Sequence, residues 1–210
     1  MTSYAVRLLQ LVTGLTACAV GIVMTLRSGL GVSPWDVLHG GVAERTGIAF
    51  GTVVQLVGLV VLALGVLLGG VRPGLGTFAN IALIGTVENV LLDAGWLAGL
   101  DERGLVIRSA VLLAGVAVIG FGAALYIGAH LGAGPRDSLM VALHVRSGRS
   151  VGLARTVVEI VALVVGLLLG GPFGVGTVLY AVGIGAAVQL WFRVLRQTPA
   201  RLPETTGEPL

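Results

Sequence analysis

The sequence is poor in charge. Only 11% of its 210 residues are charged and 56% are hydrophobic, with a mean hydropathy of +1.01. Ordinary soluble domains carry about 25% charged residues. A soluble domain of this size needs more polar residues, because its surface is large relative to its volume. The composition therefore excludes an ordinary soluble domain and indicates an integral membrane protein.

Lysine is absent, and cysteine occurs once, as Cys18. All 13 basic residues are arginines, mostly at the ends of apolar runs, so the pI near 9.8 does not indicate a nucleic-acid partner. One cysteine excludes an internal disulfide framework and a multi-cysteine metal site. No zinc spacing, phosphate loop, dinucleotide fingerprint or catalytic triad is present. We therefore expect no enzyme, no cofactor and no bound metal.

Six apolar stretches are long enough to cross a bilayer, which takes about 20 residues. Glycine and proline at 70–74 and 170–174 break two long runs into hairpins. The polar run 101–103 marks the centre of the molecule, and the tail 197–210 is expected to be disordered. The predicted spans are 8–26, 50–70, 75–93, 106–128, 152–171 and 175–193.

The chain repeats itself at an offset of 101, since LGVSPWDVL at 30–38 recurs as LGAGPRDSL at 131–139. We predict a first membrane repeat at 1–97, a polar connector at 98–105 and a second repeat at 106–196. The same offset aligns Arg7 with Arg108, Gly14 with Gly115, Gly21 with Gly122, Gly51 with Gly152 and Gly65 with Gly166. After a one-residue deletion, Gly76-Thr77 aligns with Gly176-Thr177 and Gly85 with Gly185.

Each repeat has three predicted spans, so the second repeat enters the membrane from the opposite side. This is an inverted repeat about an axis in the membrane plane, an arrangement common among secondary transporters. The arginines favour cytoplasmic termini, since nine then lie inside and four outside. The inner set is Arg7, Arg72, Arg136, Arg146, Arg149, Arg155, Arg193, Arg196 and Arg201, and the outer set is Arg27, Arg45, Arg103 and Arg108.

Between the first and second spans of each repeat, the segments 34–46 and 135–147 are predicted to form short helices. Thirteen helical residues cover about 20 Å, which is too short to cross a hydrocarbon core of about 30 Å. We expect half-helices that are re-entrant or lie at the interface. If they enter from opposite faces, their N-termini approach the midplane, where the positive helix ends attract anionic groups.

Each short helix begins with a cap, a proline and an aspartate. In one interpretation, Asp36 and Asp137 only cap the helix starts by accepting local backbone N–H bonds. In the other, they also contact a substrate. The residues concerned are Ser33, Pro34 and Asp36 in the first repeat, and Gly134, Pro135 and Asp137 in the second.

Polar residues inside spans are the remaining clues, because a charge in the bilayer core costs upward of about 2.5 kcal/mol. Glu88 lies inside the third span beside Asn89, and it either coordinates substrate or protons, or is hydrated near the outer boundary. Glu159 is expected to pair with Arg155, four residues earlier. Three amides predicted to bond between helices or to line a pathway are Gln55, Asn80 and Gln189. The candidate substrate-binding residues are Ser33, Pro34, Asp36, His39, Glu88, Asn89, Pro135 and Asp137.

Cys18 raises a competing interpretation of the first span. The sequence LTAC at 15–18 is similar to a lipoprotein cleavage site that follows a charged segment and an apolar stretch. Cleavage there would remove a helix that the repeat uses, so we expect Cys18 to be a packing residue inside the first span.

The run GLGVSPWDVLH at 29–39 resembles the YczE/YyaS/YitT group of bacterial membrane proteins, as do the turn at 74–77 and the span after it. The likeness covers essentially the whole chain. The second repeat keeps only Leu131-Gly132, Pro135 and Asp137 of this motif. The resemblance implies a multi-pass protein of the bacterial plasma membrane, and it implies no activity.

Together these features favour a small secondary transporter or channel for an unidentified solute, with a midplane site between the two repeats. Two alternatives remain open, a membrane accessory or scaffold protein and the substrate-binding subunit of a larger importer. The expected partners are the lipid bilayer and a small solute, with a homo-oligomer as a further alternative.

Overall fold

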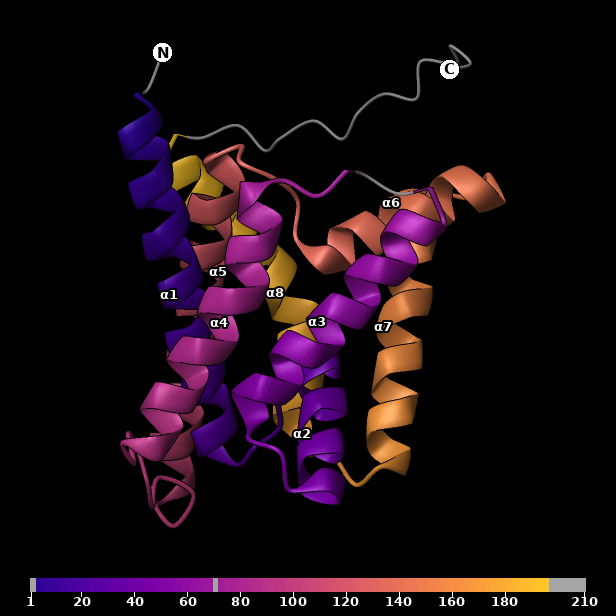
Figure 1. The fold of residues 1–210 in the computed structure, drawn as a ribbon. Helices are drawn as coiled ribbons and strands as arrows, with labels where there is room; N and C mark the ends of the chain where they lie inside the picture. Colours follow the sequence, from indigo (N-terminus) through magenta and orange to yellow (C-terminus); the bar gives the residue numbers. More distant parts are fainter. Residues whose placement is uncertain (1–2, 70–71, 197–210) are drawn as a thin grey trace.

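The computed structural model describes residues 3–69 and 72–196, and in these residues it contains eight helices and no strand (Figure 1). The all-α prediction is therefore confirmed, while the tail 197–210 lies outside the described residues. The helices are α1 (Tyr4–Ser28), α2 (Pro34–Thr46), α3 (Phe50–Leu67), α4 (Leu75–Asp93), α5 (Leu105–Gly128), α6 (Pro135–Ser147), α7 (Val151–Leu168) and α8 (Val175–Val194).

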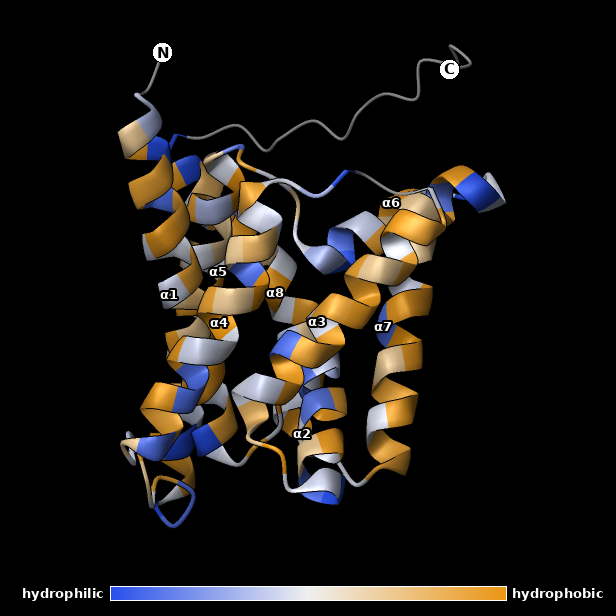
Figure 2. Ribbon diagram, in the orientation of Figure 1, coloured by the Kyte–Doolittle hydropathy of each residue, from blue (hydrophilic) through white to orange (hydrophobic). Residues whose placement is uncertain are grey.

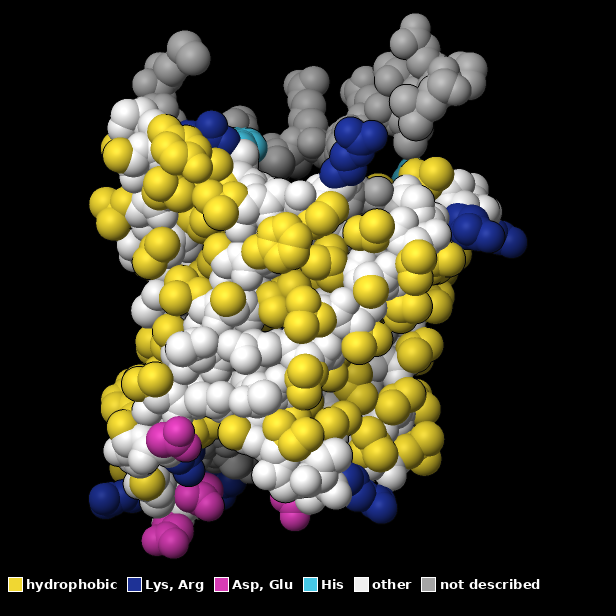
Figure 3. All heavy atoms as spheres, in the orientation of Figure 1, with side chains coloured by type: hydrophobic (Ala, Val, Ile, Leu, Met, Phe, Trp, Pro, Cys, Tyr) yellow, Lys and Arg dark blue, Asp and Glu magenta, His cyan; other side chains and the backbone are white. Residues whose placement is uncertain are grey.

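All helices except α2 and α6 are long and apolar enough to cross a membrane, which confirms six candidate spans. Apolar segments fill the middle of the bundle (Figure 2). On the face drawn in Figure 3, Arg side chains lie at both ends of the bundle, and Asp and Glu side chains lie at the lower end. The helices α3 and α7 end three residues before the predicted spans do. Gly69 and Gly170 cause this difference, because each has a left-handed φ, +83° and +86°, that ends the preceding helix.

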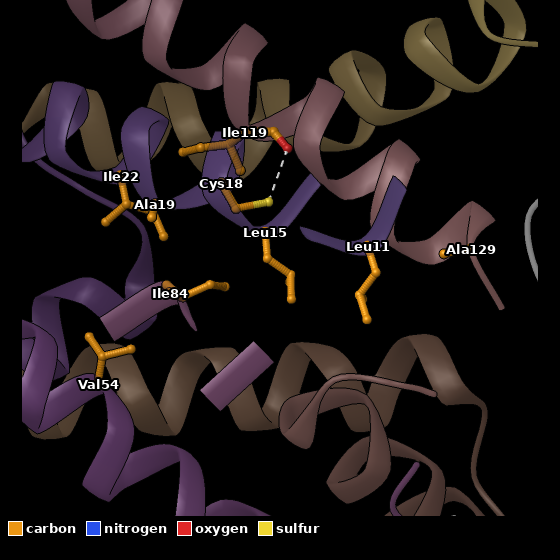
Figure 4. Packing of buried hydrophobic residues seen from close by; sticks show 9 residues of the cluster. All are labelled: Leu11, Leu15, Cys18, Ala19, Ile22, Val54, Ile84, Ile119 and Ala129. Carbon is orange, nitrogen blue, oxygen red and sulfur yellow. Dashed lines mark hydrogen bonds between the residues drawn. The ribbon is translucent and has the colours of Figure 1, made fainter. Parts of the chain in front are cut away.

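The helices α1 and α5 run antiparallel and pack against each other along most of their length. Gly14 packs on Gly122 and Gly21 on Gly115, so closely that a Cβ on Gly14 would lie 2.7 Å from the carbonyl oxygen of Gly122. Cys18 is 5% exposed here, and its Sγ lies 3.8 Å from the backbone oxygen of Ile119 (Figure 4). Cys18 is therefore a packing residue between α1 and α5.

Two arginines at equivalent positions hold the ends of this pair. Arg7 at the start of α1 donates to the backbone oxygens of Ala129 and His130, just beyond α5. Arg108 at the start of α5 donates to the last residue of α1, with 2.7 Å to the oxygen of Ser28, and to the oxygen of Gly29. Each guanidinium thus satisfies carbonyls left free at the end of the opposite helix.

The Gly-x-Gly-Thr turns brace the segments that precede the short helices. The N–H of Gly76, at the start of α4, donates to the oxygen of Leu131 at 2.8 Å, and the N–H of Gly176, at the start of α8, donates to the oxygen of Leu30 at 2.7 Å. Thr77 adds a bond from its hydroxyl to the oxygen of Ala133 at 2.6 Å. Each half of the chain therefore fixes where the short helix of the other half begins.

The two short helices cover 34–46 and 135–147, as the sequence predicts. The helix α2 packs on α7 and α6 packs on α3, so each lies against the other half of the chain. Gly166 and Gly65 permit these contacts, because each lies against the backbone of the short helix. In Figure 1, α2 lies toward the end of the bundle that holds the α4–α5 connection, and α6 toward the opposite end.

Candidate functional site

A cavity of about 380 Å³ lies where α2 and α6 begin. Both halves of the chain line it, through the starts of the short helices and through α1, α3, α4, α5, α7 and α8. Its volume is in the range of small-molecule sites. Its main polar and aromatic lining residues are Ser33, Trp35, Asp36, His39, Asn80, Tyr126, Arg136, Asp137, Arg155, Glu159, Tyr180 and Gln189.

The start of α2 is a closed hydrogen-bond network. The hydroxyl of Ser33 accepts from the N–H of Asp36 at 3.2 Å and donates to Asp36 Oδ2 at 2.5 Å. The other carboxyl oxygen of Asp36 lies 3.2 Å from His39 Nδ1. Asp36 and His39 are 2% and 1% exposed. The predicted N-cap Ser33 is confirmed, whereas Asp36 accepts no backbone N–H among the described residues, and its two oxygens contact the Ser33 hydroxyl and His39 instead.

The start of α6 repeats this arrangement with different side chains. The backbone N–H of Gly134 donates to Asp137 Oδ2 at 3.2 Å. At the offset of 101, Arg136 stands where the first half has Trp35, and Met140 where it has His39. The second start therefore adds a cation in place of an aromatic ring.

These two equivalent residues meet in the cavity. The guanidinium carbon of Arg136 lies 4.8 Å from the centroid of the Trp35 ring, in a cation–π contact. Within residues 3–69 and 72–196, Arg136 makes no ion pair and no side-chain hydrogen bond. The other lining arginine, Arg155, bonds Glu159 at 2.9 Å, as predicted.

Most predicted site residues line this cavity, and two do not. Ser33, Pro34, Asp36, His39, Pro135 and Asp137 are brought together there. Glu88 is 0% exposed, away from the cavity lining, and neither carboxyl oxygen has a partner among the described residues. Exposure of Glu88 to solvent is therefore wrong, while its depth in the membrane stays a prediction. Asn89 binds α3 instead, through the N–H of Gly51 at 2.8 Å and the hydroxyl of Thr52 at 3.0 Å.

Sequence reasoning missed Arg136, Trp35 and the two tyrosines of the cavity. It counted Arg136 among the arginines of the inner face, whereas the structure places this side chain in the cavity lining. The signal was available, because Arg136 lies inside the repeated motif, between Pro135 and Asp137. Of the three amides, Gln55 bonds α4, while Asn80 and Gln189 line the cavity.

The helices α3 and α4 meet along a line of contact that we call the α3/α4 seam, and this seam is closed. A Cβ on Gly51 would overlap the carbonyl oxygen of Gly85, so the two backbones are in direct contact. Gln55 Nε2 bonds the hydroxyl of Thr86 and the oxygen of Ala82, both at 3.0 Å, and Asn89 adds the bonds given above. In each of these two helices, 33% of the 18-residue apolar stretch is buried.

The equivalent α7/α8 seam is open. No described atom outside their own helices or chain neighbours lies within 4 Å of the Cβ position of Gly152 or of Gly185. Only 22% of the corresponding apolar stretch of α7 and 17% of that of α8 are buried. Because Arg155, Glu159, Gly185 and Gln189 line the cavity, the cavity extends to this open seam.

No group of three or more His, Cys, Asp or Glu side chains that could hold a metal ion occurs in the part of the chain that the structure describes. The carboxylates of Asp36 and Asp137 instead accept hydrogen bonds at the helix starts, and that of Glu88 has no partner among the described residues.

Comparison with known proteins agrees with the motif resemblance. The model of a family of unknown function, DUF6198, matches residues 5–193. An uncharacterized protein of Haemophilus influenzae is 36% identical over 193 residues, covering 90% of this chain and 84% of the relative. The uncharacterized membrane protein YczE of Bacillus subtilis is 34% identical, covering 82% and 79%, and YyaS of the same organism is 27% identical, covering 79% and 82%. No solved structure matches this chain.

Proposed function

The chain belongs to DUF6198, a family of multi-pass membrane proteins of unknown function, and we propose that it is a small secondary transporter or channel for a small solute. The solute binds in the cavity between the two halves, near the membrane midplane. No catalytic step is part of this function. The protein lies in the bacterial plasma membrane with both termini in the cytoplasm.

The contacts between the halves support an inverted repeat with re-entrant half-helices. Arg7 and Arg108 make the same contact with exchanged partners, and so do Gly76 and Gly176. The pairs α2 with α7 and α6 with α3 are exchanged in the same way. An inverted repeat predicts such reciprocal contacts, because its axis exchanges the two halves.

The observation that carries the proposal is the difference between two equivalent seams around one cavity. The α3/α4 seam is closed by backbone contact, while the α7/α8 seam is open. With both termini in the cytoplasm, Gly152 near the start of α7 and Gln189 near the end of α8 would lie on the cytoplasmic side, and the opening would face the cytoplasm. Exchange of the two states would close this seam and open the equivalent one, near Gly51 and Asn89, to the outside. This is alternating access.

Cysteine pairs test this exchange without knowledge of the solute. In a Cys18→Ala background, Thr52→Cys with Asn89→Cys reports the closed α3/α4 seam, since these side chains touch at 3.0 Å. The equivalent pair, Leu153→Cys with Gln189→Cys, reports a closed α7/α8 seam. Disulfides form only when the Cβ atoms come within about 4.5 Å.

Both pairs are expected to cross-link in native membranes under mild oxidation. When the disulfide of one pair locks its seam closed, residues at the other seam should stay accessible to a thiol reagent. Cross-linking of the 52/89 pair alone, with the 153/189 pair free in every condition, would contradict alternating access. A fixed structure with one open seam would favour a scaffold or a subunit whose partner covers α7 and α8.

A further inference from the structure

The cavity contains two unused hydrogen-bond donors. Trp35 is 6% exposed and lines the cavity, and its indole N–H has no acceptor within the described ranges. Arg136 stacks on the same ring and has no anionic partner among those residues. Stacking over the ring leaves the N–H edge of a guanidinium free to bind an acceptor. A buried donor without an acceptor is costly, so the buried N–H of Trp35, beside the half-buried Arg136, points to a ligand that accepts hydrogen bonds.

The acids of the cavity do not supply this acceptor. Asp36 is held by Ser33 and His39, Asp137 by the N–H of Gly134, and Glu159 by Arg155. Each negative charge of the lining is therefore already engaged locally. The Arg136 guanidinium, in contrast, has no ion pair and no side-chain hydrogen bond among the described residues.

The short helices strengthen the positive field at this point. Both α2 and α6 begin at the cavity, and a helix N-terminus carries about half a positive charge. The Ser33 hydroxyl accepts the N–H of Asp36 and the Asp137 carboxylate accepts the N–H of Gly134, and these two bonds engage only part of the N–H groups at the two helix starts. The rest of the wall is apolar and includes Ile22, Val54, Ile81, Ile84 and Ile119.

We propose that the cavity binds a small organic anion, with its charged group on Arg136 and the indole N–H of Trp35 and its apolar part against the aliphatic wall. This assignment rests on the proposed function, because it names the class of solute that the same site would carry. A planar oxyanion such as a carboxylate or sulfonate suits the guanidinium, which binds it through two parallel hydrogen bonds.

Thermal unfolding of the purified full chain in nanodiscs tests binding. The probes are benzenesulfonate, benzoate and phenyl phosphate, compared with neutral benzenesulfonamide and cationic benzyltrimethylammonium at equal ionic strength. At least one anion is expected to raise the Tm in a saturable way, while the neutral and cationic probes leave it unchanged.

Arg136→Gln should weaken the binding of that anion by at least about tenfold. Arg136→Lys should weaken it less, and Trp35→Phe, which keeps the ring and removes the N–H, should also weaken it. Arg149→Gln is the matched control, because Arg149 lies outside the cavity lining, and it should bind as the parent does. The Lys and Phe variants keep the test decisive if Arg136→Gln does not fold.

The ligand class is overturned if no anion stabilises the protein, if benzenesulfonamide binds as well as benzenesulfonate, or if Arg136→Gln and Arg136→Lys bind as the parent does. Uptake into phosphatidylcholine–phosphatidylglycerol liposomes separates this result from the proposed function. Uptake of benzyltrimethylammonium in place of the anion would leave transport standing and remove the anion assignment. Saturable anion binding without uptake would keep the assignment and contradict transport.

Discussion

The α3/α4 seam and the α7/α8 seam carry equivalent glycines and pack differently. Gly51 lies against Gly85 backbone to backbone, whereas Gly152 and Gly185, at the same repeat positions, contact no described atom beyond their own surroundings in the chain. Small residues therefore permit a close helix contact without enforcing it. The polar groups differ, since Gln55 and Asn89 hold the first seam while Thr156 and Gln189 occupy their places in the second.

In the proposed alternating access, this difference would set the balance between the two states. The hydrogen bonds of Gln55 and Asn89 stabilise the closed α3/α4 seam, and each such bond contributes about 1 kcal/mol. The second seam lacks the counterpart of Gln55, so its closed state is the less stable one. A bound solute would have to favour that closed state by a comparable free energy to exchange the seams.

The largest effect is expected from adding a methyl group to one glycine of each seam. Gly51→Ala should lower the free energy of unfolding by about 3 kcal/mol, because the new Cβ overlaps the Gly85 carbonyl. Gly152→Ala should raise it by up to about 1 kcal/mol, because the helix gains propensity and nothing is displaced. Thermal unfolding of both variants measures the difference.

Gly183→Ala on α8 is the control, since its Cβ position is also free of described neighbours and it has no glycine at the equivalent position of the first half. If the α7/α8 seam closes during function, Gly152→Ala should also reduce the 153/189 cross-link. Equal destabilisation by Gly51→Ala and Gly152→Ala would show that both seams are closed in the membrane, contrary to the comparison.

A smaller effect is expected from the amides. Asn89→Ala removes the acceptor of the Gly51 N–H and the donor to Thr52, and should cost about 1–2 kcal/mol in unfolding free energy. Gln189→Ala at the equivalent position should cost close to nothing, because Gln189 is exposed and has no described hydrogen bond. Chemical denaturation in detergent measures both, and a loss of similar size from Gln189→Ala would mean that the second seam is held in the same way.

The architecture could be predicted because hydropathy and capping are local properties. Apolar length gave the six spans, and proline with a cap residue gave the starts of α2 and α6. The repeat also aligns Arg7 with Arg108, and the structure explains this match, because each arginine binds carbonyl oxygens at the end of the opposite helix. Such features depend on neighbours within a few residues or on the repeat itself.

The cavity could be predicted only in part, because its composition depends on how the helices cross. Asp36 and Asp137 follow from the motif, but the meeting of Arg136 with Trp35 requires the two short helices to face each other. Charge counting placed Arg136 among the arginines of the inner side, because it cannot tell an arginine that lines a cavity from one that flanks a span. Likewise, the sequence predicts Asn89 as a site residue, whereas in the structure its side chain joins α4 to α3.

The smallest perturbation locates the ends of the two short helices, which is where an inverted repeat and a parallel one differ most. Thr46 and Ser147 are the exposed last residues of α2 and α6. In a Cys18→Ala background, single cysteines there should leave stability nearly unchanged. An impermeant thiol reagent on intact cells should label Thr46→Cys, and Ser147→Cys only after lysis, with Cys18→Ala alone unlabelled. Equal labelling at both positions would mean that α2 and α6 cross the membrane, giving four spans per half in parallel. The exchange of seams would then no longer open the cavity to opposite sides.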